Sequence, residues 1–289
     1  MTATALAVLT PDPDDDGRYD DWRTQATQLE RLLPDVPIVY RPWSSDAEPA
    51  ALTLPLMTWG YHRHLDRWYA ALDAWDAAGS HFANSVSVLR WNTDKAYLVD
   101  LAARGVGVVP TIDVTMFDED ALAQARAALG TAELVIKPPV SAGSDATFRL
   151  SSTDGAPPAV VGTRMLVQPL MPDILEHGEL SLFYLGGTLA HAIVKRPKSG
   201  DFRVQPQFGG RASAIDPPAV ARAAAEAALA ASGPGLLYAR VDLVPDGDDF
   251  RLMEIELIEP WLYLDQARDG GAAFANAIRH ALSTIEALA

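Results

Sequence analysis

The chain has 289 residues, of which 49% are apolar and 21% charged, a composition typical of a folded protein with room for two compact domains. Its formal net charge of −15 argues against nucleic acid and anionic membranes as partners, because both are themselves negative. The lack of cysteine excludes disulfides, thiolate metal sites and a cysteine nucleophile, and the lack of a long apolar span or signal-like start predicts a soluble cytoplasmic protein.

The first 80 residues alternate between short apolar runs and stretches with helical spacing. Strands are predicted at 5–9, 36–40 and 52–59, and helices at 19–33 and 65–77. This alternation predicts an α/β domain with a largely parallel sheet, which binds ligands in the loops at the carboxyl ends of its strands. His62 lies in such a loop and is a candidate contact for an acidic substrate, with a purely structural loop residue as the alternative.

Residues 82–94 are predicted to lead into a second unit, which begins near residue 92. Its predicted elements are a helix at 95–104 capped by Asn92 or Thr93, a strand at 106–110, a helix at 119–128 and strands at 133–137 and 165–168. Lys137 ends one strand and precedes a loop of small residues that contains Ser141, Gly143 and Ser144. Such a loop can turn backbone N–H groups toward phosphate oxygens, and an ordinary turn is the alternative. It is not a Walker A loop, because the lysine precedes the glycine.

A basic cluster follows a predicted hairpin at 178–185 and 188–195. Lys195, Arg196, Lys198 and Arg203 place four of the chain's 23 lysine and arginine residues within nine positions, and Gly210 and Arg211 lie just beyond. In a chain with a net charge of −15, this concentration of cations indicates an anionic ligand, although a solvated charged loop would give the same pattern.

A hairpin is predicted between helices at 217–231 and 273–288, with strands at 236–244 and 250–258 around a Pro-Asp-Gly turn. Glu254 and Glu256 are two residues apart and therefore share a face, onto which Asp242 can be brought from the other strand. Three carboxylates on one face suit Mg²⁺. Arg240 lies on the face of Asp242 and could neutralise a transferring phosphate. The alternative is the solvated face of an amphipathic hairpin.

Lys95, Lys137, the small-residue loop, the basic cluster and the D…E-x-E hairpin occur in a fixed order. In this order the chain resembles the ATP-grasp superfamily, and within it the glutathione-synthetase-like and RimK-like ligases, over residues 84–265. The segments KRPKSGDFRVQPQFGGRA, ARVDLV and MEIELIEP carry most of the resemblance. The acidic loop after the first strand and the WGYH stretch are similar to RimK-type members and to the cyclo-ligase that closes O-ureido-D-serine to cycloserine.

The resemblance implies both a fold and a chemistry. An N-terminal parallel-sheet α/β domain (1–91) would precede a two-part α+β grasp, made of a central subdomain with a phosphate lid (92–168) and a C-terminal subdomain with a magnesium site (169–289). ATP would lie between the two halves of the grasp. A substrate carboxylate would become an acyl phosphate, from which an amine would displace phosphate.

The resemblance also assigns roles to individual residues. Those implied to bind ATP are Lys95, Lys137, Ser141, Gly143, Ser144, Gln168, Leu170, Glu179 and Lys195, with the Gln168 side chain and the Leu170 backbone at the adenine and Glu179 at the ribose. Those implied to hold Mg²⁺, as two ions that Mn²⁺ could replace, are Asp242, Glu254 and Glu256. Those implied to stabilise charge on the transferring phosphoryl group are Lys195, Arg203 and Arg240.

Three positions depart from the pattern of glutathione synthetase. Glu256 replaces the asparagine that is commonly the third metal ligand, Gln205 also replaces an asparagine, and Ile-Glu-Pro at 258–260 replaces a segment rich in serine and threonine. The last change argues against glutathione synthesis and makes Glu259 a candidate for recognising an amino group or polar head. The predicted substrate contacts are His62, Arg203, Gly210, Arg211 and Glu259.

Two classes of function stay open from the sequence. The first is an ATP-dependent carboxylate–amine ligase for a small amino-acid-like or peptide substrate, acting between two molecules or within one as a cyclo-ligase. The second is a nucleotide-binding scaffold or sensor that has kept the fold without the chemistry. The presence of Arg240 together with all three carboxylates favours the ligase. The resemblance further implies a homo-oligomer, either a dimer or a tetramer.

Overall fold

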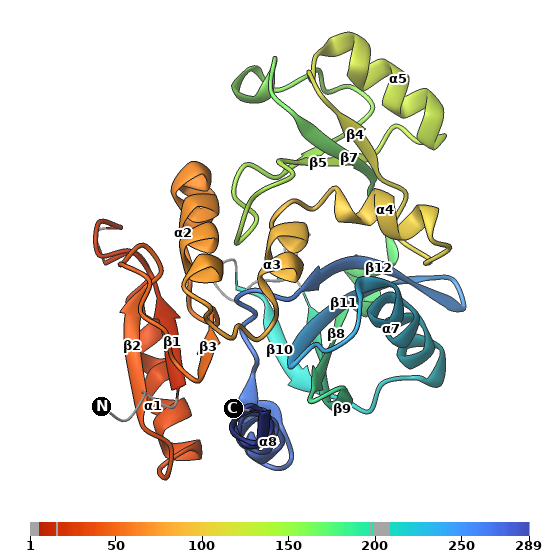
Figure 1. The fold of residues 1–289 in the computed structure, drawn as a ribbon. Helices are drawn as coiled ribbons and strands as arrows, with labels where there is room; N and C mark the ends of the chain where they lie inside the picture. Colours follow the sequence, from red (N-terminus) through yellow and green to blue (C-terminus); the bar gives the residue numbers. More distant parts are fainter. Residues whose placement is uncertain (1–5, 16, 197, 199–208, 289) are drawn as a thin grey trace.

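The computed structural model describes residues 6–15, 17–196, 198 and 209–288, and it contains three sheets (Figure 1). The N-terminal sheet is parallel, and the central and C-terminal sheets are antiparallel, as expected for an α/β domain followed by an α+β grasp. No helix within these ranges has the length and apolarity needed to cross a membrane.

The N-terminal sheet has the strand order β2-β1-β3. Its elements are β1 (Leu6–Thr10), α1 (Trp22–Leu32), β2 (Ile38–Pro42), β3 (Leu52–Leu54) and α2 (Leu65–Ala77). β1 is buried along its whole length, which is expected for the central strand of a covered parallel sheet. β3 ends earlier than the predicted 52–59, because Pro55 has no N–H to donate to the ladder.

The last helix of the chain completes the N-terminal core. α8 (Ala272–Leu288) packs against α1, and Phe274 and Ile278 are fully buried in the same apolar cluster as Val8 and Leu29 (Figure 1). Residues that are more than 200 positions apart in the sequence therefore share one core.

The central sheet has the strand order β4-β7-β5-β6 and carries α5 on one side (Figure 1). Its elements are β4 (Ile112–Val114), α5 (Glu119–Leu129), β5 (Leu134–Lys137), β6 (Phe148–Leu150) and β7 (Met165–Pro169). α5 begins after Asp118, whose carboxylate accepts a hydrogen bond from Ala121 N at 2.8 Å, and it ends at Gly130, where φ is +65°. β6 was not predicted from the sequence.

The apolar run at 106–110 does not form the strand that was predicted for the central unit. Val109 N donates to Leu252 O at 2.9 Å, and Leu252 N donates to Gly107 O at 2.8 Å, so this run lies along the edge of the C-terminal sheet. Pro110 lacks the N–H that a longer ladder would need, and the strand of the central sheet starts at Ile112.

Residues 82–104 contain two helices where one was predicted. α3 (Val86–Thr93) starts after Ser85, whose hydroxyl accepts a hydrogen bond from Val88 N at 3.5 Å, and α4 spans Tyr97–Ala103. Asn92 and Thr93 lie in the last turn of α3 and do not cap the second helix as predicted. The N-cap position of α4 is Ala96, which has no side-chain cap, and Asp94 accepts a hydrogen bond from Ala96 N at 2.8 Å in the turn before the helix. The β-branched valines of α3 favour an extended chain, which explains why the helix was missed.

The C-terminal sheet has the strand order β10-β9-β8-β11-β12, with α7 across one face (Figure 1). Its elements are β8 (Glu179–Leu185), β9 (Thr188–Arg196), β10 (Arg211–Ala214), α7 (Ala219–Ser232), β11 (Tyr238–Asp246) and β12 (Asp249–Glu256). The hairpin predicted around Gly186-Gly187 is confirmed. The turn of the second hairpin is tighter than predicted, because Asp246 already pairs with Asp249.

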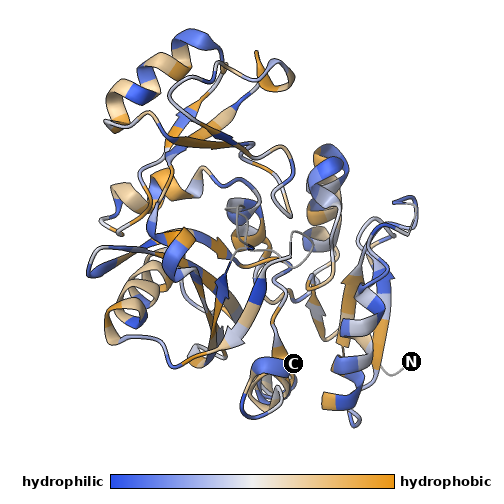
Figure 2. Cartoon of the chain, turned by 180° about the vertical axis from the view of Figure 1, so that it is seen from behind, coloured by the Kyte–Doolittle hydropathy of each residue, from blue (hydrophilic) through white to orange (hydrophobic). Residues whose placement is uncertain are grey.

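The remaining helical elements of the described residues are short. They are η1 (Tyr61–Arg63), η2 (Pro158–Val160), α6 (Asp173–His177) and η4 (Leu264–Gln266). Figure 2 shows apolar strands flanked by helices that carry both apolar and polar residues, the pattern of amphipathic helices over buried sheets. The domain ranges 1–91, 92–168 and 169–289 stay a prediction. Their first boundary lies inside α3, and α8 packs on the first range.

Candidate active site

Three carboxylates meet on the hairpin of β11 and β12. Asp242 and Glu254 lie directly opposite each other in the register, and Glu256 lies opposite Arg240, two residues further along the ladder. One oxygen of each carboxylate lies within 4.8 Å of the oxygens of the other two. The structure thus brings together the three acids that the sequence pattern placed on one face.

A β-bulge beside the carboxylates separates them from the core. The register shifts between Asp242 and Leu243, so that Met253 is the additional residue of β12. Without this shift, Leu252 would share the face of Glu254, because alternate residues of a strand point the same way. With the shift, Leu252 lies opposite Leu243, and both side chains are fully buried in the cluster that also contains α7.

Cationic side chains contact all three acids. Arg240 Nε donates to Asp242 Oδ1 at 3.1 Å, Arg240 Nη2 donates to Oδ2 at 2.8 Å, and the same guanidinium pairs with Glu256. The other ion pairs of the site are Lys95–Glu254 at 3.2 Å, Lys195–Asp242 at 3.3 Å and Lys195–Glu179. This network holds Arg240 in one orientation on the sheet.

Burial and charge pairing oppose each other at these carboxylates. Burial favours the neutral form of Asp242, but Arg240 and Lys195 outweigh it and hold the pKa at about 2. Burial raises the pKa of Glu256 to about 7, because Glu254 and Asp242 add to the effect and outweigh Arg240. The acids thus differ in charge state: Asp242 is held ionised, whereas Glu256 takes up a proton more readily. Convergent carboxylate oxygens fit Mg²⁺.

Two lysines predicted to bind phosphate lie close to this cluster. Lys137 ends β5 and is only 8% exposed. Its burial lowers the pKa of the ammonium, an effect that Glu254 opposes. Lys95 pairs with Glu254 and also donates through Nζ to the carbonyl of Ser141. Lys95 therefore connects the carboxylate site to the loop of small residues.

The small-residue loop contains three residues with left-handed backbone. Gly143 and Ser144 have φ values of +60° and +63°, and Ala146 has a φ of +50°. Turns can direct backbone N–H groups toward an anion, and the phosphate role of this loop stays a prediction. Ser141 Oγ donates to Pro138 O at 3.4 Å.

The predicted adenine and ribose contacts already have partners within the protein. Gln168 is 3% exposed, and its Nε2 donates to Thr111 Oγ1 at 2.8 Å, which leaves the amide oxygen to accept from an amino group. Leu170 N donates to Glu133 O at 2.9 Å. The backbone contact of Leu170 with the adenine stays a prediction, with the carbonyl oxygen as its candidate group. Glu179 is buried and paired with Lys195.

The surroundings of His62 disfavour the cationic form that would bind an acidic substrate. Burial lowers its pKa to about 4, and the nearby Lys95 adds to this effect. The imidazole is therefore neutral at pH 7, and a substrate contact would be a hydrogen bond. Its Nδ1 is buried and has no hydrogen-bond partner in the part of the chain that the structure describes.

Glu259 lies beside a stacked tryptophan pair. The rings of Trp59 and Trp261 are 5.8 Å apart at 15°, and Trp59 Nε1 donates to the Glu259 carbonyl at 3.3 Å. Burial raises the pKa of the Glu259 carboxyl to about 8, and Glu256 adds to the effect. The pair joins the loop after β3 to the segment after β12. Residues from the N-terminal and C-terminal parts of the chain therefore lie together beside Glu259.

The basic cluster is only partly described. Arg211 starts β10, where it is exposed and lies opposite Arg196 of β9, and Gly210 precedes it. Arg203 and Gln205, which the sequence analysis also singled out, lie outside the described residues.

One contact of the carboxylate cluster was not predicted from the sequence. Ser181 is fully buried on β8, where it lies opposite Asp242 and donates its hydroxyl to Asp242 Oδ1. Its position two residues after Glu179 places both side chains on one face of the strand, and this alternation was the available signal.

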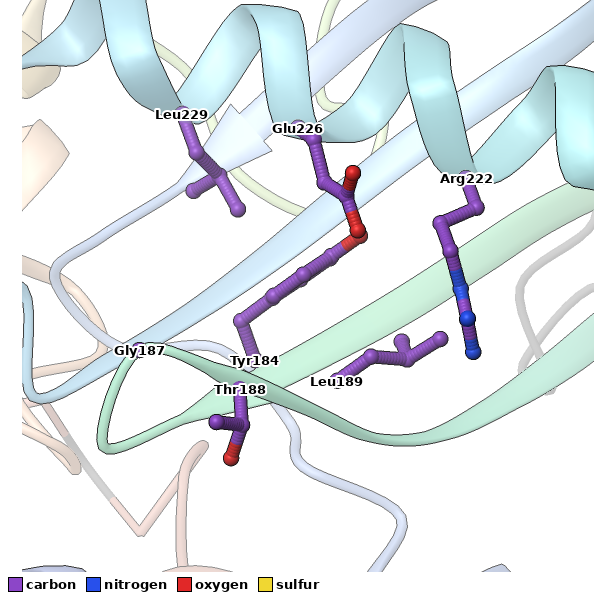
Figure 3. Close-up of a pocket in the computed structure, with 7 residues that line it drawn as sticks. All are labelled: Tyr184, Gly187, Thr188, Leu189, Arg222, Glu226 and Leu229. Carbon is purple, nitrogen blue, oxygen red and sulfur yellow. The ribbon is translucent and has the colours of Figure 1, made fainter.

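A cavity of about 440 Å³ lies at a different place, between α7 and the turn of the β8–β9 hairpin (Figure 3). Arg222 and Glu226 project into it from α7, and Tyr184 and Leu189 line it from the strands. None of the clustered carboxylates lines this cavity. The convergence of the acids, and not the size of a cavity, therefore marks the candidate site.

Comparison with known proteins found no matching family model. The chain is 35% identical over 216 residues to the cycloserine biosynthesis protein DcsG of Streptomyces lavendulae, covering 68% of this chain and 71% of that protein. It resembles the crystal structure of D-cycloserine synthetase DcsG with a TM-score of 0.82 at 27% identity, over 96% of this chain and 99% of that one.

Two further structures share the fold at lower identity. D-alanine–D-alanine ligase from Bacillus anthracis, complexed with ATP, has a TM-score of 0.73 at 14% identity and covers 100% of both chains. The ATP-grasp ligase PsnB, complexed with a minimal precursor, Mg and ADP, has a TM-score of 0.66 at 16% identity, over 98% of this chain and 99% of that one. These two likenesses concern the fold alone.

Proposed function

The chain belongs to the ATP-grasp ligase superfamily, and on this premise we propose that it closes a small amino-acid-like substrate into a ring at the expense of ATP. Formation of a carbon–nitrogen bond between a carboxylate and an amine is the reaction class of these ligases. The relative DcsG is named for cycloserine synthesis. Cyclisation of O-ureido-D-serine, which the WGYH stretch suggests, is the specific reaction proposed.

The cluster of Asp242, Glu254 and Glu256 is the observation that carries this proposal. Its oxygens converge within 4.8 Å and would hold Mg²⁺, as two ions, with Mn²⁺ as a substitute. Bound Mg²⁺ would neutralise the β- and γ-phosphate oxygens of ATP.

The phosphates of ATP would lie between Lys137, Lys95 and the small-residue loop. The two ammonium groups act as point charges, and the backbone N–H groups of Ser141, Gly143 and Ser144 add directional donors. Closed over the phosphates, this loop would also exclude water from an acyl phosphate, which water would otherwise hydrolyse. The contacts proposed for the nucleoside are the Gln168 amide oxygen, the Leu170 carbonyl and the Glu179 carboxylate.

Arg240 and Lys195 would stabilise charge during phosphoryl transfer. A substrate carboxylate oxygen attacks the γ-phosphorus and ADP leaves. In O-ureido-D-serine the oxygen-bound nitrogen of the ureido group then attacks the acyl carbon, gives its proton to solvent and releases phosphate, and water removes the carbamoyl group to leave the ring. The negative charge that develops in both steps needs donors that are already oriented. Arg240 meets this need because two bonds to Asp242 fix its guanidinium. Arg203 is proposed for the same role.

The substrate would lie against Glu259 and the Trp59–Trp261 pair. An amino-acid-like substrate carries an ammonium group. A bound ammonium would lower the pKa of Glu259 from its value of about 8, so that the ionised carboxylate forms a charge-assisted hydrogen bond with it. Neutral His62 would add a hydrogen bond. The exposed Arg211 and the preceding Gly210 are proposed to contact the other end of the substrate.

The reaction is tested by phosphate release from Mg-ATP across amino acids, dipeptides and O-ureido-D-serine, with Glu254→Gln as the blank. We expect release with O-ureido-D-serine alone, and a cyclic product smaller than the substrate by at least one water. Release that requires a carboxylate together with a separate amine would replace the cyclo-ligase with a two-substrate ligase. Light scattering on the same samples tests the predicted homo-oligomer.

A further inference from the structure

The free edge of β12 is covered by side chains for which no role at the site was predicted from the sequence. β12 is the last strand of its sheet, so one side of its backbone has no neighbouring full strand. Asn84, Asn92 and Tyr97 occupy this side, and they are 0%, 7% and 2% exposed. All three come from residues 84–97, the segment that contains α3 and leads into α4.

Asn92 and Tyr97 hold both backbone groups of Ile255, the residue between two of the clustered acids. The Tyr97 hydroxyl donates to Ile255 O and accepts from Ile255 N–H, both at 3.0 Å. Asn92 Nδ2 donates to the same carbonyl at 2.8 Å, and its amide oxygen accepts from Leu257 N–H at 2.8 Å. The peptide groups on either side of Ile255 are therefore fixed from the free edge as well as from β11.

Asn84 extends this contact to the end of the hairpin. Its Nδ2 donates to Leu257 O at 2.8 Å and to Tyr238 O at 2.9 Å, and its amide oxygen accepts from Leu237 N–H at 2.8 Å. One side chain thus ties the start of β11 to the end of β12.

The same segment also reaches a carboxylate and the loop of small residues. Lys95 lies between Asn92 and Tyr97 in the sequence, and its Nζ pairs with Glu254 while donating to Ser141 O. Lys95 N donates to Pro139 O at 2.8 Å. The residues 92–97 therefore hold the backbone of β12, one of its acids and the loop at once.

We propose that Asn92 and Tyr97 are positioning residues, which set the separation of Glu254 and Glu256 and thereby the metal affinity of the site. The two acids are on either side of Ile255, so any rotation of its peptide groups changes the distance between their oxygens. Residues that orient metal ligands typically change metal affinity by about 10- to 100-fold when altered. This inference rests on the proposed role of Glu254 and Glu256 as metal ligands.

Tyr97→Phe tests the proposal, with Tyr40→Phe as the matched control. Each variant loses one hydroxyl that bonds a backbone carbonyl, but the Tyr40 hydroxyl donates to Ala26 O at 3.0 Å in the N-terminal domain. Binding of Mn²⁺ to the full nucleotide-free chain is measured by electron paramagnetic resonance. We expect affinity to fall about tenfold or more in Tyr97→Phe and to stay at the wild-type value in Tyr40→Phe. Wild-type affinity in Tyr97→Phe would overturn the proposal.

Two further variants keep the outcomes distinct. Asn92→Ala removes the other contact with Ile255 and should also weaken Mn²⁺ binding, which covers the case in which Tyr97→Phe does not fold. Glu254→Gln tests the metal site itself. If this variant binds Mn²⁺ as wild type does, the metal-site proposal fails. If Glu254→Gln loses binding while Tyr97→Phe and Asn92→Ala retain it, only the positioning role fails.

Discussion

The carboxylates of the site differ in how fully their charge is compensated, and Glu256 is compensated least. Asp242 pairs with Arg240 and Lys195. Glu256 pairs only with Arg240 among the described residues, and it lies beside two other acids. Related ligases commonly place a neutral amide at this position. Substitutions at position 256 can therefore show whether the metal site needs the side-chain oxygen, its negative charge, or both.

Glu256→Asn should keep the metal site, because the amide oxygen can still coordinate Mg²⁺ while the surplus charge is removed. We expect Mn²⁺ to bind within about tenfold of wild type. Glu256→Ala, which removes the oxygen, should bind at least about tenfold more weakly than the asparagine variant. Titration of both variants with Mn²⁺ gives the comparison, and equal affinities would refute a ligand role for position 256.

Glu259→Gln should weaken binding of the amino-acid substrate and not of ATP. Loss of one charge-assisted hydrogen bond costs about 1.5–3 kcal/mol, or roughly 10- to 150-fold in affinity. We expect KM for O-ureido-D-serine to rise by this factor, while KM for ATP stays constant. The exposed Glu226→Gln on α7 serves as the control. An analogue without the amino group should bind wild type and Glu259→Gln with the same affinity. If Glu259→Gln weakened binding of the analogue as much as binding of O-ureido-D-serine, ammonium recognition by Glu259 would be contradicted.

At the scale of the element, the bulge at Met253 decides which side chains of β12 face the site. Deletion of Met253 would remove the bulge and make Leu252 the direct neighbour of Glu254, so simple alternation would keep Leu252 in the core and Glu254 on the site face. We therefore expect the deletion variant to bind Mn²⁺ within about tenfold of wild type. Deletion of Ile255 is the contrast, because it makes Glu254 and Glu256 direct neighbours that point to opposite faces, and it should abolish Mn²⁺ binding. Equal Mn²⁺ affinities of the two deletion variants would show that strand alternation does not set the face of the acids.

Elements with a strong local pattern were predictable, and elements that depend on distant contacts were not. The β11–β12 hairpin was predicted because alternation and a Pro-Asp-Gly turn are local signals. The run 106–110 was assigned to the wrong sheet, since its partner, Leu252, is more than 140 residues away. α3 was missed because its valines favour strands, whereas Asn92 at its end is held by the edge of β12.

At the scale of the whole molecule, the three acids and their cations could be predicted from motif order, but their connections could not. Nothing in the sequence indicates that Leu170 N is already engaged by Glu133 or that Tyr97 bonds Ile255. Likewise, the packing of α8 against α1 depends on a core assembled from both ends of the chain. The sequence pattern gives the side-chain chemistry, and the tertiary contacts determine which groups remain available to a ligand.

The pH dependence of global stability follows from the burial of His62. Its pKa is lowered from 6.5 to about 4, so between these values the unfolded chain binds a proton that the folded chain does not. Stability from this group is therefore complete above pH 6.5 and falls as the pH drops toward 4, by up to about 3 kcal/mol. Other acids titrate in the same range, so a comparison with a variant is needed.

His62→Gln removes the contribution of His62 to the pH dependence of stability. Urea denaturation gives the unfolding free energy of wild type and of His62→Gln. The value for wild type minus the value for the variant should fall by up to about 3 kcal/mol between pH 7 and pH 4. His81→Gln at an exposed position provides the control for replacing a histidine by glutamine elsewhere in the chain. Parallel pH profiles for wild type and His62→Gln would mean that the folded protein accommodates a protonated His62. In that case His62 could contact an acidic substrate as a cation.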